Sequence, residues 1–413
     1  MQISPPVCDN PSAPVQRHLA ARGMERNLAE TLLFLIFFAL ATIGYPLAGA
    51  LTTLFAPDTQ TISYAYRGLV LALSVLVFVN AAFRGRLQPI PLSLLLFFLA
   101  GSLRLFYDNY FTYITDSDKV AQYFFGTVMI PALAVAAACK SYSAKYFPLV
   151  IWVLSATIVM TIGFIEAFDL AGAADLSKNV GRLFFQSLNP TLIAYSSYFA
   201  IISGVILWTR VPLTMRIIFT FVAVVAVYLM LITAARGAWL TLILGGAVVA
   251  WSKKNISLVV FLSLAALAIV LVFPDVTVTL LERFSNVGVD RSSDERLFAL
   301  QSSWATALEN PIYGIAYVDP IALFYPHNLI VESGVAMGVC GMGMMVYIQI
   351  RLLLIGRALA ETGDVMLAVF VITVLSEAFL SGSIWQSADF WAVAALTFGL
   401  PRQAALQGRR RSG

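Results

Sequence analysis

The chain has 413 residues, of which 60% are hydrophobic and 12% are charged, and its mean hydropathy is +0.85. Soluble globular domains contain roughly 25% charged residues, so this composition excludes them and predicts an all-α, polytopic integral membrane protein. The net charge of +4 is too small to indicate a nucleic-acid partner. The three cysteines (Cys8, Cys139 and Cys340) form no CxxC pair, so we expect neither a disulfide framework nor a metal site built on them.

Apolar runs long enough to cross a bilayer recur along the whole chain. A spanning helix needs about 20 mostly apolar residues. Twelve such runs predict one membrane domain over 1–413 with about 12 transmembrane helices. The expected spans are residues 28–54, 65–83, 89–106, 120–139, 147–169, 188–208, 213–233, 236–251, 256–273, 328–350, 365–382 and 385–401.

Basic residues predict the orientation of these spans, because short loops rich in Lys and Arg stay in the cytoplasm. They concentrate in the tails 1–27 and 402–413 and in alternate short gaps, such as 84–86 and 253–254. We therefore expect both termini to be cytoplasmic. The opposite face carries most of the acids.

The longest outward gap, 274–326, lies between the ninth and tenth expected spans and carries a helix signal. Ser292 is followed three residues later by Glu295, as in a capping box. Apolar residues then recur at helical spacing until Asn310-Pro311 ends the run. These residues are Leu297, Leu300, Trp304 and Leu308. We expect an amphipathic helix that lies at the outer membrane surface.

Four outward arginines are the first candidate site residues. Arg236 begins the eighth expected span, Arg182 precedes the sixth, and Arg291 and Arg296 lie on the loop helix. Ionisable groups at membrane depth are costly and usually serve function or a specific pair. Simpler interpretations remain open: Arg236 could contact lipid phosphates, Arg296 could pair within its own helix, and Arg182 and Arg291 could be solvated.

His327 is the candidate catalytic residue, since it follows a proline and lies at the start of the tenth expected span. An imidazole with an unperturbed pKa of about 6.5 can accept or donate a proton near neutrality. A packing role is the alternative. Acids in or near the last spans are interpreted as pairing partners of other side chains. They are Glu332, Glu377 and Asp389.

The outward arginines and the histidine suit the chemistry of a lipid-linked pyrophosphate. Guanidinium groups bind phosphate oxygens in bidentate fashion. They can also stabilise charge that develops on a leaving pyrophosphate. We therefore expect neither a metal nor another cofactor.

Three motifs of the chain resemble the O-antigen ligase and polymerase superfamily of bacterial membrane glycosyltransferases. The order of parts, the twelve expected spans and the large outward loop are similar as well. Ala235 and Ala316 depart from the usual family pattern. The motifs are Arg236-Gly237-Ala238, then Arg296-Leu297 with Trp304, Ala307-Leu308-Glu309-Asn310-Pro311-Ile312 and Gly314, and finally His327-Asn328 with Glu332.

The resemblance implies a GT-C-like enzyme in the inner membrane of a Gram-negative bacterium, with its active site facing the periplasm. Its donor is a glycan on undecaprenyl pyrophosphate, and the acceptor of a ligase is lipid A–core. By position, Arg236 and Arg296 bind pyrophosphate and His327 activates the acceptor hydroxyl. Gly181-Arg182 followed by Asn189-Pro190 is similar to another family segment, so Arg182 is a further expected pyrophosphate ligand, as is the outward Arg291. Asn189, Asn328 and Glu332 are expected to be supporting residues.

Two alternatives to the ligase stay open. A polymerase would use the same donor with a carrier-linked acceptor, although the compact cytoplasmic gaps and single large loop favour the ligase. A transporter of lipid-linked sugars would place charged residues along a path across the bilayer. The cationic residues outside the cytoplasmic gaps instead gather on one face, which favours a site at one surface.

Overall fold

The computed structural model describes residues 13–55, 59–112, 117–168, 189–233, 235–253 and 291–400. Every regular element within these ranges is helical, which confirms the all-α prediction. The elements are α1 (Ala13–Ile43), α2 (Tyr45–Phe55), α3 (Thr59–Phe83), α4 (Leu92–Tyr107), η1 (Asp108–Thr112), α5 (Ser117–Tyr123), η2 (Phe124–Met129), α6 (Ile130–Ala138), η3 (Cys139–Ser141), α7 (Phe147–Ala167), α8 (Pro190–Leu207), η4 (Trp208–Arg210), α9 (Leu213–Thr233), α10 (Arg236–Lys253), α13 (Arg291–Glu309), α14 (Leu329–Thr362), α15 (Val365–Leu380) and α16 (Ala388–Gly399).

Seven of the described helices are long and apolar enough to cross a membrane, and a bent pair raises this number to eight. Three other expected spans form the shorter apolar helices Arg236–Ser252, Val365–Leu380 and Ala388–Gly399. The expected span 256–273 lies outside the described residues. The chain is thus a multi-pass membrane protein, while the prediction of twelve full-length spans is not confirmed.

The first expected span, 28–54, is broken rather than continuous. Leu28–Ile43 and Tyr45–Phe55 meet at an angle of 72°. Pro46 explains the break, because proline lacks an N–H donor and its ring clashes with the carbonyl four residues earlier in a continuous helix. The hydroxyl of Tyr66 on α3 donates to the carbonyl of Leu40 just before the break. A broken helix of this kind brings polar backbone and side chains to the edge of a cavity.

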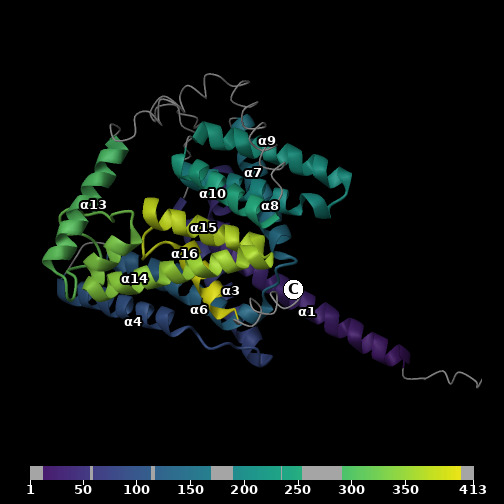
Figure 1. The fold of residues 1–413 in the computed structure, drawn as a ribbon, viewed down its shortest axis with the longest axis horizontal. Helices are drawn as coiled ribbons and strands as arrows, with labels where there is room; N and C mark the ends of the chain where they lie inside the picture. Colours follow the sequence, from purple (N-terminus) through teal and green to yellow (C-terminus); the bar gives the residue numbers. More distant parts are fainter. Residues whose placement is uncertain are drawn as a thin grey trace, which may run out of the picture.

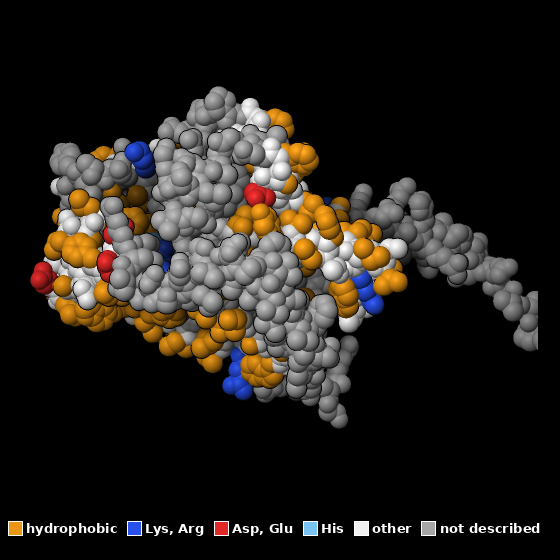
Figure 2. Space-filling view, turned by 90° about the horizontal axis from the view of Figure 1, so that it is seen from above, with side chains coloured by type: hydrophobic (Ala, Val, Ile, Leu, Met, Phe, Trp, Pro, Cys, Tyr) orange, Lys and Arg blue, Asp and Glu red, His pale blue; other side chains and the backbone are white. Residues whose placement is uncertain are grey.

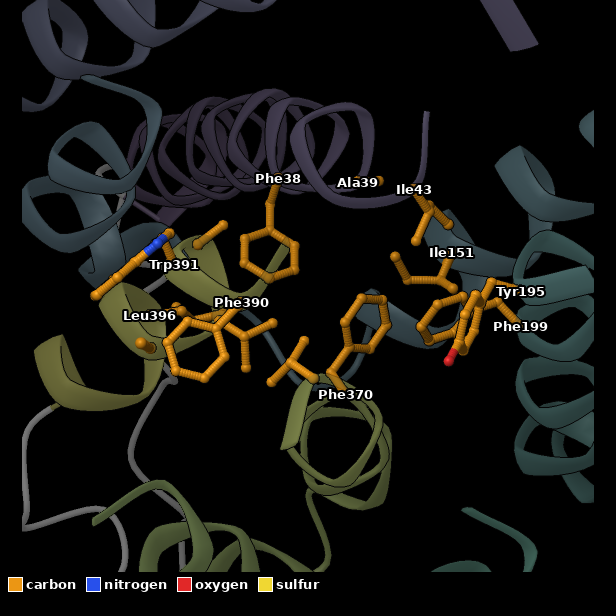
Figure 3. Close-up of a cluster of buried hydrophobic side chains, with 14 of the residues drawn as sticks. Phe38, Ala39, Ile43, Ile151, Tyr195, Phe199, Phe370, Phe390, Trp391 and Leu396 are labelled. Carbon is orange, nitrogen blue, oxygen red and sulfur yellow. The ribbon is translucent and has the colours of Figure 1, made fainter. Parts of the chain in front are cut away.

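Helix α15 lies at the centre of the molecule, between α14, α10 and α16 (Figure 1). Aromatic side chains fill the space around it, as Figure 3 shows for Phe38, Phe199 and Phe370. The Phe199 and Phe370 rings stack with centroids 4.4 Å apart, and the Phe38 and Phe370 rings lie 5.9 Å apart. Such ring pairs contribute about 0.5–1.5 kcal/mol beyond their burial.

The helix expected in the outward loop is α13, which runs from Arg291 to Glu309. Its small residues Ala299 and Ala307 are buried, and α13 packs on α14. The larger Leu297, Trp304 and Leu308 are exposed. Hydrophobic side chains also cover much of the described surface in Figure 2, as expected of surfaces that face lipid.

Candidate active site

His327 lies in the loop between α13 and α14, immediately before the cap of α14. Its φ of 54° is in the left-handed region, where histidine is one of the few residues enriched. Asn328 is the N-cap of α14, and its Oδ1 atom accepts from the backbone N–H groups of Ile330 and Val331 at 3.0 and 3.2 Å. The supporting role expected of Asn328 is thus local, since it fixes where the helix begins and where His327 points.

Two buried carboxylates anchor this loop. Asp108 at the end of α4 accepts from the backbone N–H of Tyr317 at 2.6 Å. Asp319 accepts from the hydroxyls of Ser303 and Thr306 on α13, both at 3.2 Å. Hydrogen bonds to charged groups contribute about 1.5–3 kcal/mol each. The loop is therefore tied to α4 and α13 before it reaches His327.

A close backbone contact holds the start of the loop against α14. Gly314 has a φ of +67°, and the next residue, Ile315, donates from its backbone N–H to the Val335 carbonyl at 2.8 Å. Gly338 has a φ of +65° and kinks α14 at the same place. A Cβ atom at Gly338 would lie 2.5 Å from the Pro311 carbonyl oxygen. Both positions therefore need glycine.

Arg296 and His327 converge on the C-terminal end of α15. Arg296 Nη1 donates to the carbonyl of Leu380 at 3.3 Å, and His327 Nδ1 lies 3.5 Å from the carbonyl oxygen of Ser381. Burial, and next the Arg296 guanidinium, lower the pKa of His327 to about 4. His327 is therefore neutral near pH 7 and able to accept a proton or a hydrogen bond.

Both side chains line a cavity of about 430 Å³. Its walls come from the break between α1 and α2, from α3, the N-terminal half of α8, α15 and the segment before α16. Ile43, Tyr195, Phe199 and Phe370 line it and appear together in Figure 3. The cavity is therefore apolar toward the core and polar at the end that holds Arg296 and His327.

Glu332 on α14 supports this end of the cavity from behind. Its side chain is 1% exposed; Oε1 accepts from the Ser383 hydroxyl and Oε2 from the Ile384 N–H, both at 2.7 Å. No Lys or Arg of the described ranges forms an ion pair with this carboxylate, whose partners are these two donors. Glu332 instead fixes the segment after α15, which carries the Ser381 carbonyl.

Glu377 and Asp389, both expected to pair with other side chains, pair with each other. Both line the cavity, their carboxyl groups interact with each other, and Glu377 also interacts with Tyr195. Neither forms an ion pair with a Lys or Arg of the described ranges. No group of three metal-ligating side chains occurs in that part of the chain. The pair gives the cavity an acidic wall.

The other expected site residues occupy different places. Asn189 lines the cavity and caps α8, because its Oδ1 atom accepts from Thr191 N at 2.9 Å. Arg236 begins α10 and is not among the described cavity-lining residues. It is nevertheless near, since a Cβ atom on the next residue, Gly237, would lie 3.3 Å from the cavity-lining Tyr195 hydroxyl. Arg182 and the side chain of Arg291 lie outside the described part of the chain.

Arg67 is a further cation at this cavity, and it is not among the site residues expected from the sequence. It lies on α3 and lines the same cavity as Arg296 and His327. The available signal is a basic residue a short distance inside an apolar span. This position distinguishes Arg67 from the arginines of the loops, but it does not show that Arg67 lines this cavity.

Comparison with known proteins supports the family assignment. Residues 219–346 match a family model described as O-antigen ligase. A search of curated proteins gave no match. The matched segment contains Arg236, Arg296 and His327, which are the residues of the three motifs. This match supports the membership of the chain in the O-antigen ligase superfamily.

Proposed function

We propose that this protein is a glycosyltransferase that moves a glycan from undecaprenyl pyrophosphate to a sugar hydroxyl of lipid A–core. In its expected setting, a Gram-negative inner membrane, the cavity faces the periplasm. The observation that carries the proposal is the convergence of Arg296 and His327 on one cavity within the matched region. Glycan transfer from a pyrophosphate needs a cation that binds the pyrophosphate and a base that accepts the hydroxyl proton, and an arginine and a neutral imidazole supply these two functions.

In the proposed reaction, the acceptor hydroxyl oxygen bonds to the anomeric carbon of the donor glycan from the face opposite the pyrophosphate. The bond between that carbon and the pyrophosphate oxygen breaks, so the configuration inverts and undecaprenyl pyrophosphate leaves. His327 takes the hydroxyl proton. Arg296, with Arg236 beside the cavity, stabilises the leaving charge. A bound pyrophosphate raises the pKa of His327 from about 4, which makes the imidazole a better base when substrate is present.

An apolar groove next to the site suits the polyprenyl tail. The groove has a volume of about 520 Å³ and lies between α10, α14 and α15. Leu380, whose carbonyl accepts a hydrogen bond from Arg296, and Leu240, one turn after Arg236, both line this groove. A polyprenyl tail attached to an anionic head at these arginines would therefore have the groove within reach.

Purified protein in detergent tests this function. Offered donor together with lipid A–core, the wild type should form the glycosylated lipid, and His327→Ala should bind donor without transferring it. The same cavity could serve a polymerase, since the superfamily includes both activities. Growth of the carrier-linked glycan in place of lipid A–core modification would assign that reaction. Donor binding without any transfer would support a transporter.

A further inference from the structure

Arg67 is a guanidinium within a membrane-spanning helix, Thr61–Phe83. Its Nη2 atom donates to the Ser63 hydroxyl at 3.0 Å and to the Tyr123 hydroxyl. The guanidinium carbon lies 3.8 Å from the centroid of the Tyr123 ring and 5.6 Å from that of Tyr64. Hydroxyls and ring faces from two helices thus hold Arg67 in one orientation.

Arg67 differs from other half-buried cations because no carboxylate of the described ranges pairs with it. Arg104, by contrast, pairs with Asp108. The attraction between a cation and a ring face compensates only part of the cost of a charge at membrane depth. Its hydrogen bonds to described residues come from Nη2, so Nε and Nη1 remain able to donate to an anion.

Because Arg67 lines the cavity, an anion that it binds would be a ligand inside the cavity. Arg67 and its ring partner Tyr123 line the cavity with Arg296 and His327, although they belong to α3 and α5 rather than to α13 and the loop. Tyr45, at the start of α2, and Tyr66, on α3, also line this cavity. The cavity therefore has two cationic points that come from opposite ends of the sequence.

We propose that Arg67, oriented by Tyr123, is a second anion-binding point that holds a phosphate group of a substrate. This inference rests on the proposed function for the identity of the substrates. The phosphate belongs either to the pyrophosphate of the donor or to a phosphorylated sugar of the acceptor. Because Arg67 and Arg296 line one cavity, they could bind phosphate groups of the same donor, or one could bind the donor and the other the acceptor.

Binding to three phosphate probes tests the proposal. The probes are undecaprenyl pyrophosphate, lipid A–core before and after phosphatase treatment, and inorganic pyrophosphate. The variants are Arg67→Gln, Arg67→Lys and the benchmark Arg296→Gln. Arg351→Gln is the matched control, because Arg351 also donates to a tyrosine hydroxyl, that of Tyr347, and faces aromatic rings, yet does not line the cavity.

Arg67→Gln should lower the affinity for at least one probe about 10-fold or more, which is the loss expected for one charge-assisted hydrogen bond. Arg67→Lys should recover part of it, and Arg351→Gln should change nothing. Weaker binding of undecaprenyl pyrophosphate assigns the donor; weaker binding of lipid A–core only before phosphatase treatment assigns the acceptor. Unchanged binding in a folded Arg67→Gln protein, with Arg296→Gln impaired, overturns the Arg67 site alone. A wild type that binds none of the probes overturns the proposed function as well.

Discussion

Arg296 and His327 bind at consecutive carbonyl groups, those of Leu380 and Ser381, where α15 ends. The last carbonyls of a helix carry partial negative charge, which favours a guanidinium there. The arginine comes from the second turn of α13 and the histidine from the loop after it. The end of α15 therefore holds Arg296 and His327 near each other, so that the charge of Arg296 lowers the pKa of His327.

This coupling predicts that Arg296→Gln raises the pKa of His327 from about 4 toward 6.5. The increase should be partial, because burial, the larger cause, remains. His18 and His327 are the two histidines of the chain, so a His18→Gln background leaves one imidazole for an NMR titration. The exposed Arg357→Gln is the control. An unchanged His327 pKa in Arg296→Gln would show that the two groups are not coupled.

The lowered pKa of His327 also predicts a pH dependence of stability. The folded state favours the neutral imidazole, so this contribution is present above about pH 6.5 and is lost as the pH falls through about 4. The wild type should lose melting temperature between pH 7 and pH 4.5. His327→Gln should lose less over the same interval, and an equal loss in both proteins would contradict this assignment.

Replacement of Arg236 should separate binding from folding. Arg236→Ala should weaken undecaprenyl pyrophosphate binding about 10-fold or more, as expected for one lost charge-assisted contact. Arg236→Lys should recover only part of it, since an ammonium does not bind in bidentate fashion. Affinity and melting temperature are both measured. A large fall in melting temperature with little change in affinity would assign Arg236 a structural role.

Glu332→Ala should destabilise the protein by about 1–3 kcal/mol for each donor it leaves unpaired, here Ser383 Oγ and Ile384 N. It should also lower kcat, because the segment that carries the Ser381 carbonyl is released. Glu332→Gln retains an acceptor and should lose less of both. Glu361→Ala, at an exposed helical pair, is the control. Full activity in Glu332→Ala would remove the positioning role.

If the apolar groove binds the polyprenyl tail, changes in the groove should affect donors with long tails more than donors with short tails. Leu375→Trp should fill part of it and raise KM for a long polyprenyl donor several-fold, while a donor with a short prenyl chain should be unaffected. Gln349 lines the groove, and its amide has no hydrogen-bond partner in the described part of the chain. Gln349→Leu should therefore preserve or improve binding of the long donor. A loss in Gln349→Leu would indicate a polar ligand.

Local patterns predicted much of the frame around this site. The capping signal at 292–295 and the Asn-Pro stop placed α13 within a few residues, because caps and turns depend on neighbours in sequence. The His327-Asn328 pair marked the start of α14 for the same reason. The choice of Arg296 and His327 followed from the cost of outward charges and from the family resemblance.

Features that depend on contacts between residues far apart in the chain could not be predicted from the sequence. The break at Gly44 occurs in a segment that is apolar enough to span a membrane. Pro46 alone does not predict a break, because membrane helices also tolerate proline. Glu377 and Asp389 lie on separate elements, so their contact depends on how α15 packs against α16. Arg67 lies just inside the expected span 65–83, and only the packing of α3 against α5 shows that it lies beside Tyr123.

Glycan transfer by purified protein is the most direct measurement of the central claim. Undecaprenyl-pyrophosphate glycan and lipid A–core are combined with the wild type, His327→Ala and Arg296→Gln, with a chelator present. The account predicts glycosylated lipid A–core from the wild type, none from His327→Ala despite retained donor binding, and weakened donor binding by Arg296→Gln. Unchanged turnover in His327→Ala, or a wild type that binds the donor and transfers it to no acceptor, would contradict it.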